Sequence, residues 1–201
     1  MAPINRSALI FIHDQAGSPG DWSAFQTQLR SSTDLFPVRY LTPDAPAGAY
    51  LDTRECFLQA GANVRQEIEA QRERGIPLQR IGVVAYGTAA TLVLGLAAAG
   101  ELPAVGAVYA VSAGPLPPFL VEALASATEP PQSSVGRLAQ YHGADDSIVP
   151  LATAQETARV LTGAHVPGYE LVVLDNARHS LSGVTIAKII AELPSVFGVQ
   201  S

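Results

Sequence analysis

Short apolar runs alternate with longer amphipathic segments along this 201-residue chain. Strands are predicted at 8–12, 38–41, 81–84, 105–111, 138–142 and 171–174. Helices are predicted at 21–30, 55–74, 88–99, 119–127, 151–161 and 186–196. This alternation predicts an α/β fold with a mostly parallel central sheet and helices on both faces. The length fits one domain over residues 1–201.

The segment from Arg80 to Thr91 has the pattern of a buried strand, a sharp turn and an alanine-rich helix. In α/β-hydrolases this pattern carries the nucleophile elbow, G-x-S-x-G. The five residues here are Ala-Tyr-Gly-Thr-Ala, so Gly87 stands where the serine is expected. Two other interpretations are a plain strand-to-helix turn and an engineered loss of serine. On the elbow interpretation, the turn is retained and the nucleophile is lost.

Two further segments follow in the order that a hydrolase triad requires. The run His142-Gly-Ala-Asp-Asp-Ser-Ile-Val-Pro150 comes after a strand and before a helix, and Asn-Ala-Arg-His179 follows the last strand. Together with Gly87 they give the chain order nucleophile, acid, histidine.

With these motifs, the chain resembles the small carboxylesterases and acyl-protein thioesterases. The matching segments are His13-Asp14, Pro43-Asp-Ala-Pro46, Ile81–Ala90, His142–Pro150 and His179. The resemblance covers nearly the whole chain and implies an α/β-hydrolase fold. The loop after Pro46 is shorter than in the thioesterases, which implies a minimal lid and an open pocket mouth.

Carried over residue by residue, the resemblance makes Asp146 the triad acid and His179 the triad base. The backbone N–H groups of Gln15 and Thr88 would form the oxyanion hole. A simpler role for Asp146 is to cap the next helix, because acidic residues in strand-to-helix loops often do so. His179 would then be a surface loop residue.

Three other residues near these motifs are candidates for the site. Asp14 replaces the glycine that the family has after His13, and a carboxylate there would oppose negative charge developing in an oxyanion hole. His13 would bind substrate or, as a structural residue, hydrogen-bond a neighbouring loop. Tyr86 would line the pocket and donate a hydrogen bond, or would only pack. Cys56 is predicted to lie in the core.

Charge and composition exclude several kinds of partner. The formal net charge is −6 without a cluster of Lys or Arg, so neither nucleic acid nor an anionic membrane is expected. The four histidines are not at metal-ligand spacing, and no dinucleotide or P-loop motif is present. We therefore expect no metal and no cofactor, and a small, largely apolar substrate. A homodimer is expected as the commonest oligomeric state. The N-terminal residues lack a signal-peptide pattern, which favours a cytoplasmic location.

Losing the serine lowers turnover of a serine-protease triad about 10⁶-fold, so an acyl-enzyme is not expected. His179 held by Asp146 would instead act as a general base in a cyclase, isomerase or lyase type of reaction. The alternatives are a carboxylesterase or thioesterase that uses direct water attack or has been inactivated, and a non-catalytic pseudoenzyme that binds a ligand or partner.

Overall fold

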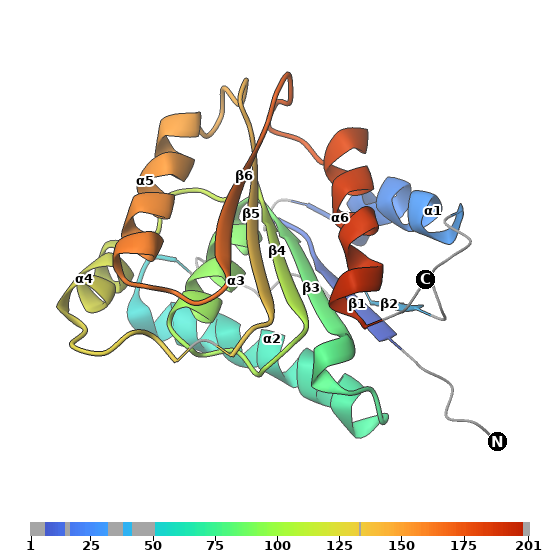
Figure 1. Cartoon of the computed structure of the whole chain (residues 1–201), viewed down its shortest axis with the longest axis horizontal. Helices are drawn as coiled ribbons and strands as arrows, with labels where there is room; N and C mark the ends of the chain where they lie inside the picture. The colour runs from blue at the N-terminus through green and yellow to red at the C-terminus, as the bar shows by residue number, and fades with distance from the viewer. Residues whose placement is uncertain (1–6, 15–16, 32–37, 42–50, 133, 199–201) are drawn as a thin grey trace.

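Six parallel strands form the centre of the computed structural model, which describes residues 7–14, 17–31, 38–41, 51–132 and 134–198 (Figure 1). The strands are β1 (Ser7–Ile12), β2 (Val38–Leu41), β3 (Ile81–Tyr86), β4 (Ala107–Val111), β5 (Arg137–Gly143) and β6 (Tyr169–Leu174). They lie in the order β2-β1-β3-β4-β5-β6, and each neighbouring pair is parallel. The predicted parallel sheet is confirmed.

Helices cover both faces of this sheet, as Figure 1 shows. They are α1 (Ser23–Ser31), α2 (Arg54–Glu73), α3 (Thr88–Ala98), α4 (Pro118–Ser126), α5 (Leu151–Gly163) and α6 (Gly183–Val196). Helices α1 and α6 lie on one face, and α2 to α5 lie on the other. None of the described helices is long and apolar enough to span a membrane.

Burial on both faces explains why the strands are continuous apolar runs rather than alternating ones. In β1, Leu9 and Phe11 pack under α1 and α6, while Ala8, Ile10 and Ile12 face the opposite layer. Every residue of β1 is buried. The core therefore consists of two apolar layers that hold the sheet rigidly between them.

The helix boundaries follow local signals in the sequence. The Thr53 side chain accepts a hydrogen bond from the Cys56 N–H at 3.1 Å and begins α2, and Gly75 lies just past its end with a φ of +82°. One prediction about this helix is wrong: Cys56 is exposed rather than in the core. It lies in the first turn of α2, while Phe57 and Ala60 make the buried contacts.

Parallel strands bring their carboxyl ends to one edge of a sheet, where ligands bind in open α/β folds. At this edge β1 leads to Asp14, β3 to Gly87, β5 to Asp146 and β6 to His179. Four distant segments of the chain therefore meet above the same edge.

Candidate active site

Gly87 joins β3 to α3 in a backbone conformation that other residues rarely adopt. Its φ is +62° and its ψ is −128°, a region populated almost only by glycine unless the surroundings enforce it. The Gly87 N–H donates to the Val111 carbonyl at 3.0 Å, and the Gly87 carbonyl accepts from the Thr91 N–H at 3.2 Å. The turn is thus hydrogen-bonded to the end of β4 on one side and to the first turn of α3 on the other. These bonds hold its shape without a serine.

Asp146 lies in the loop after β5 with a fully buried side chain. Its Oδ1 accepts hydrogen bonds from the backbone N–H groups of Ile148 at 3.0 Å and Val149 at 2.8 Å. Its Oδ2 lies 2.8 Å from Nδ1 of His179. Burial alone would raise the pKa of Asp146, but these hydrogen bonds outweigh it and lower the pKa. Asp146 therefore fastens its own loop and holds His179 as a carboxylate.

The histidine at position 142 lies beneath this carboxylate and is buried. Its Nε2 is 2.8 Å from the Val149 carbonyl and 3.5 Å from Oδ2 of Asp146. Because the carbonyl can only accept, Nε2 carries the proton in this bond. The ring of His142 thus holds the loop that carries Asp146 through its hydrogen bond to the Val149 carbonyl.

His179 is held in place by its backbone as well as by its ring. The hydroxyl of Tyr86 donates to the His179 carbonyl at 3.1 Å, and the two rings lie 5.3 Å apart between centroids. Burial and the nearby charge of Asp14 raise the pKa of Tyr86, which keeps the hydroxyl protonated as a donor. With Nδ1 bonded to Asp146, Nε2 is the nitrogen left to exchange a proton with a ligand. Tyr86 thus acts on the position of His179.

Gly143 lets the loop that carries His179 approach β5 very closely. A Cβ at Gly143 would lie 2.3 Å from the Ala177 carbonyl oxygen and 2.9 Å from that of Arg178. The Asp145 N–H also donates to the Ala177 carbonyl at 2.9 Å. The glycine of the His-Gly pair is therefore needed for the histidine loop to reach Asp146.

We predict that Gly143→Ala displaces the loop at 177–179 and lowers the free energy of unfolding by about 1–3 kcal/mol, as overpacked sites do. Urea unfolding measures this loss. Gly163→Ala is the matched control, because a Cβ there meets no atom within 4 Å. Equal stability of the two alanine variants would contradict the close approach.

The carboxylate of Asp14 occupies the space in which a serine side chain would lie. A Cβ built on Gly87 would be 2.7 Å from Oδ2 and 2.8 Å from Cγ of Asp14. Oδ1 of Asp14 accepts a hydrogen bond from the Thr88 N–H at 3.1 Å. This N–H is the donor that the family resemblance assigns to the oxyanion hole. In this chain, the Thr88 N–H donates to Asp14 instead.

Asp14, Gly87, Thr88 and His179 line one cleft of about 410 Å³. Sequence reasoning missed several of the other lining residues, among them Thr91, Ser112, Leu116, Pro117, Ile148 and Val149. Ser112 has a φ of +52° and directly follows β4. Its position at the carboxyl end of a predicted strand was the available signal, since such ends gather at one edge.

Two other predicted residues are placed differently or not at all. Nδ1 of the buried His13 ring is hydrogen-bonded to the carbonyl of the adjacent Asp14 at 2.8 Å, and His13 is not among the described residues that line the cleft. Gln15, the second predicted oxyanion donor, lies outside the described residues, as does the loop from Pro43 to Pro46 on which the minimal lid depends.

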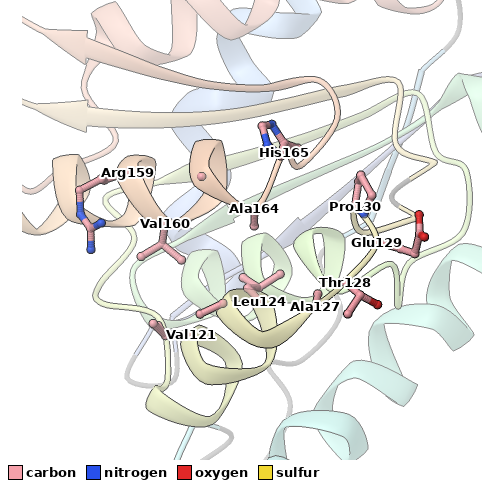
Figure 2. A pocket seen from close by; sticks show the side chains of 12 residues that line it. Val121, Leu124, Ala127, Thr128, Glu129, Pro130, Arg159, Val160, Ala164 and His165 are labelled. Atoms are coloured by element: carbon pink, nitrogen blue, oxygen red, sulfur yellow. The ribbon is translucent and has the colours of Figure 1, made fainter.

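A second hollow, of about 320 Å³, lies between α4 and α5 (Figure 2). Apolar side chains such as Val121, Leu124 and Val160 line it, together with the polar side chains of Glu129, Arg159 and His165. It shares no described lining residue with the cleft at the sheet edge. The acid–histidine pair lies at the sheet edge, so the first cleft is the candidate active site.

A parallel sheet with an elbow after β3, an acid after β5 and a histidine after β6 defines a protein of the α/β-hydrolase fold. The family model of phospholipases and carboxylesterases matches residues 36–196, and the chain belongs to this family. The predicted family is thereby confirmed.

Solved structures agree on the fold. SOBER1 of Arabidopsis thaliana is 20% identical over 95% of this chain and 99% of its own, with a TM-score of 0.79. Acyl-protein thioesterase 2 of Zea mays is 16% identical over 98% and 96%, with a TM-score of 0.72. An esterase of Thermogutta terrifontis is 16% identical over 100% and 87%, with a TM-score of 0.64. No curated protein matches the chain.

Proposed function

We propose that this protein is an enzyme that moves protons on a small, largely apolar metabolite, with His179 as general base and Asp146 as its orienting partner. The reactions that fit are isomerisation, elimination, dehydration or ring closure without a covalent acyl-enzyme. The proposal depends on one observation: the acid and histidine are joined at 2.8 Å, while a carboxylate fills the serine space.

The His179–Asp146 pair supports catalysis rather than binding alone. Asp146 is buried and bonded to two backbone N–H groups, so its orientation is fixed independently of His179. The Tyr86 hydroxyl also fixes the histidine by donating to its backbone carbonyl. A base with a fixed tautomer and a fixed ring is what proton abstraction requires.

The position of Asp14 argues against ester hydrolysis by acyl transfer. Acyl transfer needs N–H donors aimed at a developing oxyanion. Here the Thr88 N–H already donates to a carboxylate, and a second negative charge at that point would be repelled. The proposed reaction therefore develops its charge away from this N–H.

Solvent exchange tests the proposal on many candidate substrates at once. The protein is incubated in D₂O with an extract of small cellular metabolites, and mass spectrometry records which compounds gain deuterium or change mass. We expect at least one compound to gain deuterium or lose one water with the wild type. Exchange or conversion should be slower by roughly a hundredfold or more with His179→Gln.

Each outcome of this experiment decides between the candidate functions. Addition of one water to an ester or lactone would instead establish direct water attack. An extract unchanged by the wild type would overturn the enzyme proposal and leave a binding protein. His165→Gln is the matched control, since this exposed histidine lies away from the cleft.

A further inference from the structure

The first step concerns where the Asp14 carboxylate lies relative to the substrate cleft. Asp14 is partly exposed and lines the cleft together with His179. Its carboxylate is held at the start of α3, because it accepts from the Thr88 N–H and fills the space where a side chain at position 87 would lie. A carboxylate can accept about four hydrogen bonds, so it can accept one from a ligand in addition to those that it already accepts. The floor of the cleft therefore presents an acceptor where the family resemblance expects donors.

The second step concerns charge. Asp14 and His179 are the ionisable residues among the described lining of the cleft, and Asp146 lies directly behind His179. No Lys or Arg belongs to that described lining. An anionic ligand would therefore be repelled by the Asp14 carboxylate, whereas a cation or a neutral donor would gain a hydrogen bond.

The third step concerns the rest of the ligand. Leu51, Leu116, Ile148 and Val149 supply apolar walls, together with a run of prolines. A volume of about 410 Å³ is at the small end of ordinary ligand pockets. A compact apolar body with one polar end fits this lining.

From these three steps we infer that Asp14 determines the substrate class: it binds a hydrogen-bond donor, an amine or a hydroxyl, on a compact apolar body, and it excludes carboxylates and ester carbonyls. The inference rests on the proposed function in taking this cleft as the substrate site. It goes further in assigning the group that selects the substrate.

Three probes with one apolar body test this assignment: benzylamine, benzyl alcohol and benzoate. Their binding to the wild-type protein is measured by NMR titration of the Thr88 amide and its neighbours. We expect benzylamine to bind more tightly than benzyl alcohol, and benzoate to bind at least about tenfold more weakly than benzylamine, as for hydrogen bonds to charged groups.

Variants of Asp14 distinguish the effect of its negative charge from the effect of the rest of the cleft. Asp14→Asn should abolish the preference for the amine over the alcohol. Asp14→Gly should reverse the order and favour benzoate, because the Thr88 N–H then becomes available to an anion. Asp175→Asn is the matched control, an equal charge change at an exposed residue outside the cleft lining, and should retain the wild-type order.

Benzoate binding as tightly as benzylamine to the wild type would overturn the assignment, as would an unchanged order in Asp14→Asn. These measurements need no turnover, so they are independent of the exchange experiment. His179→Gln should still prefer benzylamine even though it loses catalysis. Selection by Asp14 and catalysis by His179 can thus fail separately.

Discussion

Gly87→Ser alone should give no burst of nitrophenol from p-nitrophenyl acetate, whereas the double variant Gly87→Ser/Asp14→Gly should give one. The serine Cβ would lie 2.7 Å from Oδ2 of Asp14, so the single variant must displace the carboxylate or distort the elbow. Removing Asp14 opens both the side-chain space and the Thr88 N–H. The elbow backbone already has its anchored conformation.

Stopped-flow absorbance measures the burst, and the expected amplitude for the double variant approaches one nitrophenol per site. Serine contributes a factor of about 10⁶ to turnover in a serine-protease triad, so the gain should be large. Adding His179→Ala to the double variant should remove the burst again. A full burst from Gly87→Ser alone would contradict the steric conflict, and none from a folded double variant would contradict the retained elbow.

Asp146→Asn should remove the general-base activity proposed for His179 while leaving the fold intact. Both loop N–H groups donate to Oδ1, so the new amide must place its oxygen toward Ile148 and Val149. The NH₂ group of the new amide then faces Nδ1 of His179. Because NH₂ can only donate, Nδ1 must accept, and the ring proton moves to Nε2. The equivalent change in a serine protease lowers turnover about 10⁴-fold, and a similar loss is expected here.

Nitrogen-15 NMR of the histidine rings reads this change directly, because the two tautomers have different shifts. We expect the proton of His179 on Nδ1 in the wild type and on Nε2 in Asp146→Asn. Asp145→Asn is the matched control, since the neighbouring carboxylate is exposed and outside the cleft lining. An Nδ1 proton that persists in Asp146→Asn would show that this carboxylate does not set the tautomer.

The secondary structure was largely predictable because the spacing of apolar residues and the positions of turn residues indicate the same helices and strands along this chain. The predicted helix at 151–161 is observed as Leu151–Gly163, and the strand at 38–41 is observed as Val38–Leu41. Cys56 shows the limit of this reasoning. Apolar neighbours along a helix do not indicate which side chains of its first turn face the sheet, and that is decided by packing.

The pairing of Asp146 with His179 was predictable from the sequence, but the contact between Asp14 and Thr88 was not. Sequence order was enough to pair Asp146 with His179, and the structure places them 2.8 Å apart. Gly87 in place of the expected serine and Asp14 in place of the expected glycine were visible as separate departures from the family pattern. Asp14 and Thr88 are 74 residues apart in the chain, and only the parallel pairing of β1 with β3 brings them together. No local pattern encodes such a contact.

The overlap between Asp14 and a side chain at position 87 also restricts the order in which mutations can convert one form of this site into the other. A chain with serine at 87 and glycine at 14 can reach the present pair by two routes, each of two substitutions. The route that gains aspartate first passes through a crowded intermediate, with atoms 2.7 Å apart. The route that first loses serine passes through two glycines and avoids that collision, so a chain that starts from serine and glycine is expected to lose its nucleophile before it acquires the acid.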